Sequence, residues 1–507
     1  MPPTISFSLN GAPVEVADDG CSLLEALRDR LGDRSAKDGC SPQGQCGCCT
    51  VLVDGQPRVA CVTPLARIRG RAVTTVAGLP SAAVWADALC ATGGSQCGFC
   101  TPGIVMRLAG LTAREPDPSP AAVGQALLAH LCRCTGWQTI AEAVGARGSA
   151  HPVRDLEAAA RRAAIEGGAP QRVGPAVALG EGGFADDTAP PDALVAVRAA
   201  DGSWAVGETL AEARRVAGKI QGRRTTAGPV WPIEVPDGDW ARTLRTTWVE
   251  PAYLEPDASW CRPGGEPVTP LANGGAFGGK SASPVGGIAR SLADRHGRPV
   301  RVLWSREDVV RLGPKRPPIA AGVRPDGTGV LHVAATPGVA AGIAAVVPGF
   351  EVVERSVVGP ATSASLRGAG WVEACVLAAS VAERDVVVAP GGARAEARID
   401  PDGTVHVSLR CGSVLDAVVL RSYAIGAAHQ ALGWVRREHL SVDDTGEVHD
   451  LTIRSFGVMR AVDMPRVEVT LDGDDGAPVN GSDAVFAAVA AAAWRAAGHP
   501  GRWPTEA

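Results

Sequence analysis

The sequence predicts an α+β protein built from several domains, and three observations support that prediction. The chain has 507 residues, more than a single hydrophobic core usually serves. Its hydrophobic pattern alternates as in β-strands near the start and becomes helical after about residue 80. Eleven of its fourteen cysteines lie before Ala150. We expect domains at 1–80, 81–150, 171–350 and 351–507, with a linker at 151–170.

The first 80 residues are predicted to form a small β-structure with one helix. Asn10-Gly11 and Asp54-Gly55 are turn signals between apolar stretches. Ser22 can cap a helix that Gly32 ends. The expected strands are Ile5–Leu9, Val14–Val16, Thr50–Val53 and Arg58–Val62, and the expected helix is Leu23–Leu31.

Residues 81–150 are predicted to form a bundle of short helices. Ser119 can cap the third helix, and Pro120 suits its first position. The four expected helices are Ala83–Ala91, Pro102–Leu111, Pro120–Leu131 and Trp137–Val144. The following segment, 151–170, contains a charged, alanine-rich helix and ends in Gly-Gly-Ala-Pro, which is typical of a connector.

Beyond residue 170, strands and helices alternate without a detectable repeat. A β-loop-α-β unit is expected around a glycine loop, with a strand at Pro267–Leu271, a helix at Val285–Arg295 and a strand at Pro299–Trp304. The last part is predicted to contain a helix at Asp416–Leu432, turn-linked strands from Leu440 to Val469 and a helix at Asp483–Ala497. This part is also α+β.

Composition excludes several classes of partner. Charged residues make up 20% of the chain and the formal net charge is -5, so we expect neither nucleic acid nor an anionic membrane as a partner. The start lacks a basic and an apolar signal region, and no apolar stretch is long enough to span a bilayer. We therefore expect a cytoplasmic protein. In that reducing compartment the cysteines are expected to bind metal or act in catalysis.

The first cysteine set runs Cys40-Ser-Pro-Gln-Gly-Gln-Cys46-Gly-Cys48-Cys49, with Cys61 further along. Its spacing is similar to that of plant-type ferredoxins, with one extra residue in the first gap. Glycines in the loop allow backbone amides to point at the sulfurs of an anionic 2Fe-2S cluster. We expect Cys40, Cys46, Cys49 and Cys61 to be ligands and Cys48 to be a spectator. Structural zinc is the alternative, although it usually uses two Cys-x2-Cys knuckles.

The second set consists of Cys97-Gly-Phe-Cys100 and Cys132-Arg-Cys134. The first pair directly precedes an expected helix and the second follows one, and free amides at a helix N-terminus favour an anionic group. We expect these four cysteines to hold a second 2Fe-2S cluster, with zinc again as the alternative. His130 and Cys90 are expected to be packed side chains.

Three segments now resemble a known family: Gln43-Gly-Gln-Cys46-Gly-Cys-Cys49-Thr-Val, Gln96-Cys97-Gly-Phe-Cys100-Thr-Pro-Gly and Leu131-Cys132-Arg-Cys134-Thr-Gly. They resemble the iron–sulfur domains of the xanthine dehydrogenase and aldehyde oxidoreductase family, the molybdenum hydroxylases. The resemblance covers residues 1 to about 148. It implies a β-grasp ferredoxin domain followed by a four-helix domain, each with a 2Fe-2S cluster.

The rest of the chain resembles an abridged α+β molybdopterin-binding domain of that family. The resembling segments begin at Tyr253, Gly274, Arg301, Arg367 and Gly426, in the family's order. The resemblance implies that two glycine loops approach molybdenum and its pterin, and that Arg367 supports turnover. The implied cofactor-binding residues are Gln96, Cys134, Gly275, Phe277, Gly278, Lys280, Arg367, Gly368 and Gln430.

Two departures from the family pattern stand out. The interval from Arg367 to Cys411 is far shorter than in family members. Where the family has a Gly-Glu-Pro-Pro segment with a catalytic base, this chain has Asn480-Gly-Ser482-Asp483. Asp483 is then the candidate base, and the alternative is that Ser482 or Asp483 caps the following helix.

The glycine loop also satisfies the Walker A pattern, as Gly274-Gly-Ala-Phe-Gly-Gly-Lys280-Ser281. We see no strand downstream that ends in a magnesium-binding aspartate, and the family motifs around the loop explain the same glycines. Binding of a nucleoside triphosphate is therefore the third hypothesis.

The resemblance implies a hydroxylase that oxidises a small aldehyde or N-heterocycle and sends electrons through the two clusters. No segment between the two parts resembles a flavin domain, so a separate FAD subunit is the expected acceptor and partner. The alternative function is an electron-transfer or scaffold subunit whose degenerate molybdenum domain docks a further, complete molybdenum subunit. Two features favour this alternative: Ser482, and the short interval between Arg367 and Cys411. The loops at Phe277 and Arg367 favour the hydroxylase.

Overall fold

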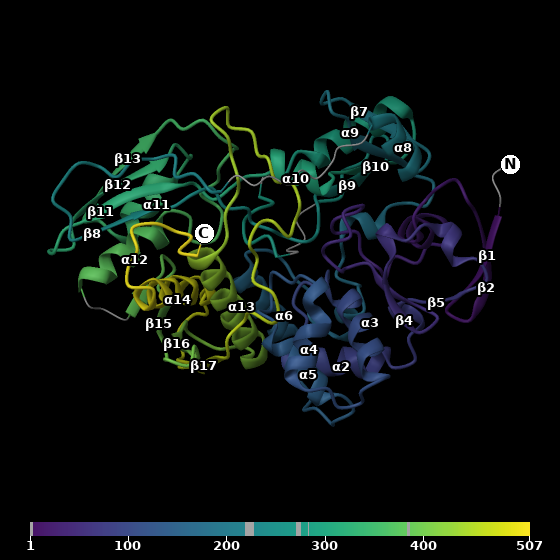
Figure 1. Cartoon of the computed structure of the whole chain (residues 1–507), viewed down its shortest axis with the longest axis horizontal. Coiled ribbons are helices and arrows are strands. Elements are labelled where there is room, and N and C mark those ends of the chain that lie inside the picture. Colours follow the sequence, from purple (N-terminus) through teal and green to yellow (C-terminus); the bar gives the residue numbers. More distant parts are fainter. Residues whose placement is uncertain (1–3, 219–227, 270–274, 282, 383–385, 507) are drawn as a thin grey trace.

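The computed structural model describes residues 4–218, 228–269, 275–281, 283–382 and 386–506 (Figure 1). At the N-terminus a five-stranded sheet has the order β2-β1-β5-β3-β4, and β1 and β5 run parallel. Its strands are β1 (Thr4–Leu9), β2 (Ala12–Ala17), β3 (Thr50–Val53), β4 (Gln56–Val59) and β5 (Ala72–Thr74). One face buries Ile5, Phe7, Leu24 and Leu27 in a separate core.

The predicted helix in this part is present, but only its first turn is α-helical. Ser22 accepts a hydrogen bond from the amide of Glu25 at 3.2 Å and so caps α1 (Leu23–Glu25), which continues as a π-helical turn, Ala26–Arg30. The predicted strand Arg58–Val62 is wrong at its end, because β4 stops at Val59. A 3-10 turn, Ala60–Val62, follows and carries Cys61.

The four predicted helices of the second part are confirmed: α2 (Ala82–Thr92), α3 (Thr101–Thr112), α4 (Pro120–Ala126) and α5 (Gln138–Ala146). Ser119 caps α4 by accepting from the amide of Ala122 at 3.2 Å. The third helix is shorter than predicted, since the chain tightens into a 3-10 turn, Leu127–Ala129, before the second cysteine pair. The turn lets the chain change direction toward Cys132.

The predicted connector is part of the packed molecule. Its helix α6 (Leu156–Gly167) is capped by Asp155 and contributes Ala159 and Ala163 to a cluster with Phe277, Val419 and Tyr423. Arg162 and Glu166 of this helix are buried. The segment 151–170 is therefore not a free tether; the domain divisions themselves stay a prediction.

A four-stranded sheet, β7-β6-β10-β9, follows in the middle of the chain. It is built from β6 (Leu194–Arg198), β7 (Trp204–Gly207), β9 (Ala258–Cys261) and β10 (Val300–Leu303), with α8 (Leu210–Ala217), α9 (Val285–His296) and α10 (Arg306–Leu312) beside it. The predicted strand Pro267–Leu271 is wrong over its described part, because residues 267–269 form no strand and are held to β9 by a single backbone bond, from the Val268 amide to the Trp260 carbonyl at 2.9 Å. Leu271 lies outside the described residues. Pro267 lacks an amide for a sheet ladder, and β9 occupies the place beside β10.

Two further four-stranded sheets and four helices form the C-terminal half (Figure 1). The first sheet has the order β13-β12-β11-β8 and is made of β8 (Arg242–Arg245), β11 (Ile319–Val323), β12 (Gly329–Ala334) and β13 (Phe350–Arg355). The second has the order β14-β15-β16-β17 and is made of β14 (Val386–Val388), β15 (Arg394–Ile399), β16 (Val405–Arg410) and β17 (Val467–Leu471). The helices are α11 (Val339–Val346), α12 (Trp371–Ala382), α13 (Ala417–Arg436) and α14 (Ser482–Ala496).

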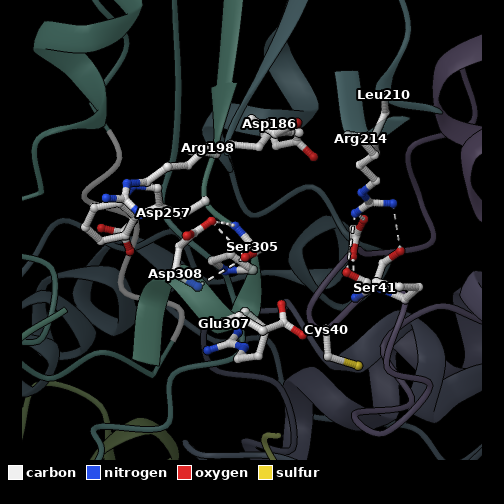
Figure 2. A pocket seen from close by; sticks show the side chains of 18 of the residues that line it. Cys40, Ser41, Asp186, Arg198, Leu210, Arg214, Asp257, Ser305, Glu307 and Asp308 are labelled. Carbon is white, nitrogen blue, oxygen red and sulfur yellow. Dashed lines mark hydrogen bonds and ion pairs between the residues drawn. The ribbon is translucent and has the colours of Figure 1, made fainter. Parts of the chain in front are cut away.

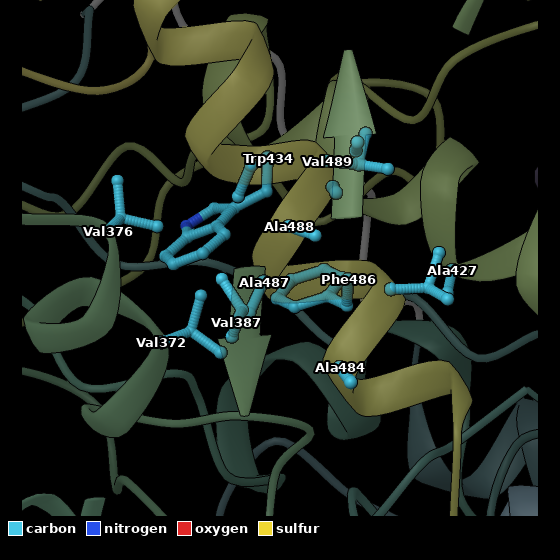
Figure 3. Close-up of a cluster of buried hydrophobic side chains, with 14 of the residues drawn as sticks. Val372, Val376, Val387, Ala427, Trp434, Ala484, Phe486, Ala487, Ala488 and Val489 are labelled. Atoms are coloured by element: carbon cyan, nitrogen blue, oxygen red, sulfur yellow. The ribbon is translucent and has the colours of Figure 1, made fainter. Parts of the chain in front are cut away.

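The largest core lies where α13 and α14 meet α12 and the strand β14 (Figure 3). Trp434 of α13 stacks on Phe486 of α14 with ring centroids 5.4 Å apart. Val372 and Val376 of α12 and Val387 of β14 surround this pair. The alanine-rich α14 suits this place, because small side chains let α13 approach closely.

The predicted strands between Leu440 and Val469 are wrong except for β17. In place of a ladder, this segment bonds to the N-terminal part of the chain. The amide of Ile453 donates to Gln43 Oε1 at 3.3 Å, and Arg454 donates to the carbonyls of Gln45 and Leu128 at 2.9 and 3.1 Å. None of the helices in the described part of the chain is both long and apolar enough to cross a bilayer.

Candidate functional site

The first cysteine set lies in a loop over the N-terminal sheet, and its four predicted ligands are all buried. The amides of Gln45 and Cys46 donate to Cys40 Sγ at 3.3 Å, and the amide of Cys61 donates to Cys49 Sγ at 3.4 Å. Such amides stabilise negative charge on sulfur. The Cys61 thiol contacts both Cys40 and Cys49, and Cys40 contacts Cys46.

Two other residues of this loop lie as predicted. The Cys48 thiol points at the carbonyl of Cys46, with a separation of 3.9 Å. His130 is packed beneath the loop, and its Nε2 lies 3.1 Å from Thr50 Oγ1. Burial lowers the pKa of His130 to about 3, so the ring is neutral.

The second set is gathered between the N-terminus of α3 and the turn before α5. Cys97 Sγ and Cys134 Sγ are 3.6 Å apart, and the thiols of Cys100 and Cys132 are hydrogen-bonded to each other. The bond from Cys100 lowers the pKa of Cys132 to about 6, and Thr135 Oγ1 lies 3.2 Å from the same sulfur. All four thiols are buried.

The thiols of the second set form two contacting pairs, whereas those of the first set follow one another in the order Cys46, Cys40, Cys61 and Cys49. A two-iron cluster needs four thiolates, two on each iron, and each set supplies four. Among the residues that the structure describes, no three histidine, cysteine or carboxylate side chains converge on the position of a single ion, as structural zinc requires. The donor set fits two 2Fe-2S clusters better than zinc.

Gln96 links the second set to the C-terminal half. Its Nε2 donates to the carbonyl of Cys134 at 3.0 Å and to Ser422 Oγ of α13 at 2.9 Å, while its buried Oε1 has no hydrogen-bond partner in the described chain. Gly426 of α13 permits this approach, because a Cβ there would lie 1.7 Å from the carbonyl oxygen of Cys134.

The glycine loop reaches the same region from the other side. Gly275 has a φ of +83°, and a Cβ on it would meet Arg133 Cβ at 2.9 Å and Cys134 Sγ at 3.3 Å. A Cβ on Gly278 would meet the carbonyl oxygen of Ser365 at 1.8 Å. The predicted Gly274 lies outside the described residues. The glycines are thus needed because other segments of the chain pack directly against this loop.

Lys280 has a charged partner within the chain. It forms a buried ion pair with Glu255, with Nζ and Oε2 2.7 Å apart. Burial raises the pKa of Glu255 to about 7 against the opposing effect of Lys280. A lysine held in this way does not offer its charge to a phosphate, which argues against the nucleotide hypothesis.

Arg367 is the centre of the remaining predicted residues. It donates from Nε to Asp483 Oδ1 at 2.9 Å, from Nη1 to Gln430 Oε1 at 3.2 Å and from Nη2 to Ser482 Oγ at 2.8 Å. Its guanidinium lies over the Phe277 ring, 3.8 Å from the centroid. Gly368 follows with a φ of +65°, and its carbonyl accepts from Arg316 at 2.9 Å. Arg367 thus brings together Phe277 and Asp483, which are 206 positions apart in the sequence.

Two family models match the N-terminal part of the chain. A model of a 2Fe-2S iron–sulfur cluster binding domain matches residues 7–67, and one of a 2Fe-2S binding domain matches residues 75–145. A nicotinate dehydrogenase subunit of Pseudomonas putida is 42% identical over 138 residues, which cover 26% of this chain and 87% of that subunit. The chain belongs to the molybdenum hydroxylase family.

Other members of the family are much longer than the matched part. Xanthine dehydrogenase of Emericella nidulans is 41% identical over 155 residues, which cover 28% of this chain and 11% of that enzyme. Among solved structures, aldehyde oxidoreductase from Desulfovibrio gigas has a TM-score of 0.71 at 14% identity over 97% of both chains. That from Desulfovibrio desulfuricans has 0.58 at 16% identity, covering 95% of this chain and 77% of the other. These structures show the fold: a multidomain α+β architecture with ferredoxin-type domains.

The molybdenum cofactor of this molybdenum hydroxylase family does not fit between the described residues. The two loops touch directly, since the Arg367 amide donates to the Phe277 carbonyl at 3.0 Å. The cavity beside them measures about 40 Å³ and is lined by Arg133, Arg316, Trp434, Glu438 and Phe486 besides the residues named above. Cofactor pockets usually measure about 300–1,000 Å³, whereas this volume holds a few water molecules.

The structure corrects the capping role considered for Ser482 and Asp483. Neither side chain caps α14, whose N-cap is Gly481. The carboxylate of Glu166 in α6 accepts from the amides of Gly481 at 3.0 Å and Ser482 at 2.8 Å, and Asn480 Oδ1 accepts from the amide of Asp483 at 3.0 Å. Asp483 is ion-paired with Arg367 at 2.9 Å, and its role as a base stays a prediction.

Sequence reasoning missed the buried ion pairs around this region, and two of them show why. Arg162 Nη1 and Glu166 Oε1 are 2.9 Å apart, and Arg133 binds Glu438 through two bonds of 2.6 and 2.8 Å. The first pair had a local signal, since the two residues are four positions apart on one helix. The second joins positions 305 residues apart and had none.

Proposed function

We propose that this chain is an electron-transfer subunit of a molybdenum hydroxylase-type oxidoreductase. Cys40, Cys46, Cys49 and Cys61 hold one 2Fe-2S cluster, and Cys97, Cys100, Cys132 and Cys134 hold the other. When bound, each cluster takes up and releases one electron. The observation that carries the proposal is the gathering of eight buried thiols in two contacting sets of four, beside a molybdenum-cofactor region that is filled by side chains.

In this proposal the chain acts in a cytoplasmic complex with two other redox subunits. A complete molybdenum subunit oxidises the small-molecule substrate, an aldehyde or N-heterocycle, and the electrons pass to an FAD subunit. The second cluster lies toward the C-terminal half, because Gln96 joins Cys134 to α13. The family relative named as a subunit of nicotinate dehydrogenase supports a multi-subunit assembly.

The first experiment counts metals in the chain purified from its native host and separated from any other molybdenum subunit. We expect about four irons per chain and no stoichiometric molybdenum. Cys49→Ser should then lower the count to about two irons and remove one cluster spectrum, because it deletes a ligand. The neighbouring Cys48→Ser is the matched control and should keep both clusters. Loss of a cluster in Cys48→Ser with retention in Cys49→Ser would contradict the assignment.

The second candidate is a hydroxylase in which this chain itself performs the oxidation. The observation that favours it is the convergence of Phe277, Gln430 and Asp483 on Arg367. It requires about one molybdenum per chain in protein free of any other molybdenum subunit. Arg367→Ala should then abolish turnover while leaving the iron–sulfur spectrum intact.

A further inference from the structure

A cavity of about 400 Å³ lies between the loop that carries Cys40 and the middle sheet (Figure 2). The Cys40 loop forms one wall, and the ends of β6, β10 and α8 with the start of α10 form others. Apolar side chains dominate the lining and include Phe99, Phe184, Leu210 and Leu303. The volume is in the usual range for a small-molecule site.

The charged groups that line this cavity are unequal in number. They comprise seven carboxyl groups and five guanidinium groups. Several are paired with each other, since Arg28 donates to Asp186 and Asp187 at 2.6 and 2.8 Å, or with a neutral group, since Arg214 donates to Ser41 Oγ at 3.2 Å. The excess of carboxyl groups gives the cavity a field that favours a positively charged ligand.

Asp257 supplies a carboxylate oxygen without a partner. It directly precedes β9 and lines the cavity on the side opposite Arg214 (Figure 2). The residue is only 2% exposed, and its Oδ1 accepts from the Tyr253 hydroxyl at 2.9 Å. Its Oδ2 has no hydrogen bond or ion pair among the described residues, yet a water-sized probe reaches it. A buried carboxylate without a cation is costly, so this oxygen is a natural contact for a ligand's positive charge.

Glu255 offers a second such oxygen two positions earlier. The residue is 3% exposed, and its Oε2 is bound by Lys280 at 2.7 Å. Its Oε1 has no partner in the described part of the chain and is also within reach of a water-sized probe. Burial raises the pKa of Glu255 to about 7, Lys280 opposes this, and the charge of Asp257 adds to the rise. The two carboxyl groups therefore repel each other, and a cation near both would be attracted by each.

We propose that this cavity binds a small organic cation, a protonated amine on an aromatic or other apolar body. The ammonium group can donate to Asp257 Oδ2 and Glu255 Oε1, while the apolar body packs against Phe99 and Phe184. Aromatic rings also attract a cation directly. Such a site goes beyond the proposed function and does not need the clusters. A bound ligand would nevertheless lie against the Cys40 loop of the first cysteine set.

The test uses the full chain with its clusters and 2-phenylethylammonium as the probe. Calorimetry at about pH 8, where Glu255 is mostly ionised, should show one saturable site. 2-Phenylethanol has the same shape without the charge, and we expect it to bind about tenfold more weakly, because it forms no charge-assisted hydrogen bond. 3-Phenylpropionate, which carries the opposite charge, should not bind.

Asp257→Asn removes the charge and keeps an oxygen that can accept from Tyr253. It should weaken binding of 2-phenylethylammonium about tenfold and leave that of 2-phenylethanol unchanged. Asp294→Asn is the matched control, because this partly exposed carboxyl group of α9 lies outside the cavity, and the variant should bind as the wild type does. Glu255→Gln is a second variant in case Asp257→Asn does not fold, and it should weaken the same binding severalfold at about pH 8.

Three results would overturn this site. The first is no saturable binding of 2-phenylethylammonium, and the second is equal binding of the ammonium and the alcohol or equal affinities in Asp257→Asn and Asp294→Asn. The third is tighter binding of 3-phenylpropionate, which would assign the cavity to an anion held by lining guanidinium groups such as that of Arg198. None of these outcomes depends on the iron content, so the metal count tests the proposed function separately.

Discussion

Gly47 separates two predicted cluster ligands and has a φ of +76°. A Cβ at this position would lie 2.5 Å from the ring of His130, which is itself buried. Gly47→Ala should therefore prevent the Cys46–Cys49 loop from closing and lower the iron content from about four to about two per chain. Iron analysis and the visible spectrum measure this loss.

The turn glycine Gly55 provides the matched control for that substitution. Its φ is +74°, almost the same, but a Cβ there would have open space within 4 Å. Gly55→Ala adds the same backbone strain without the clash, so both clusters should remain. Equal iron loss in the two variants would show that strain alone, and not the His130 contact, disturbs the loop.

Glu255 predicts a pH dependence of stability. Burial raises its pKa from 4.5 to about 7 in the folded chain, so folding favours the protonated form. Its contribution is complete below about pH 4.5 and is lost as the pH rises toward 7 and above. The free energy of unfolding of the wild type, relative to Glu255→Gln, should fall by about 3 kcal/mol between about pH 4.5 and 7.5. Urea unfolding of both proteins across this range measures it; parallel curves would refute the shift.

At the scale of elements, α6 and α14 depend on one carboxylate. Glu166 caps α14 and neutralises the buried Arg162 on its own helix. Glu166→Ala should cost about 3–5 kcal/mol, because it leaves a buried guanidinium unpaired. Replacing both residues by methionine should cost less than the sum of the single substitutions. A double-mutant cycle by urea denaturation measures this coupling.

The same helix offers a control pair with the same spacing. Arg161 and Glu157 are 3.2 Å apart but exposed, with side chains 55% and 85% accessible. Removing Glu157 should cost less than about 1 kcal/mol. If both pairs showed the same coupling, burial would not be the reason for the strength of the Arg162–Glu166 pair.

Elements that carry local signals could be predicted from the sequence. The helix α4 begins where Ser119 and Pro120 indicate, and α9 and β10 lie close to their expected bounds. The segment 440–466 could not be predicted in this way. Its apolar residues suggested strands, but its backbone is held by side chains of the N-terminal loop, such as Gln43. Contacts between positions about 400 apart leave no local pattern.

At the scale of the whole molecule, the sequence predicted which residues would gather but not what would lie between them. The resemblance implied that the loops of Phe277 and Arg367 both approach one cofactor, and in the fold the two loops touch. Whether they enclose a cofactor depends on side chains from distant segments, above all Arg133 and Glu438, which line the small cavity between the loops. Volume is a property of the packed fold, and no motif encodes it.

The Arg133–Glu438 pair also joins the two halves of the molecule. Arg133 lies between two predicted cluster ligands, and Glu438 follows the end of α13. Both side chains are buried, and Trp137 nearby donates to the carbonyl of Met459 at 3.1 Å. One hydrophobic cluster includes residues from Cys40 to Phe456. We therefore expect loss of the clusters and unfolding of the C-terminal half to occur in a single transition on heating.

Glu438→Leu tests this coupling, because it leaves Arg133 charged and unpaired beside the second cysteine set. The wild type should lose visible absorbance and native tryptophan fluorescence at one temperature, and the variant should bleach first. Arg421→Ala is the control: its pair with Glu142 also joins the two halves at 2.7 Å, but both side chains are about one-third exposed, so its removal should cost less than about 1 kcal/mol. If the wild type itself bleached well before its fluorescence changed, the two halves would unfold independently. The buried pair would then orient the two halves without coupling their unfolding.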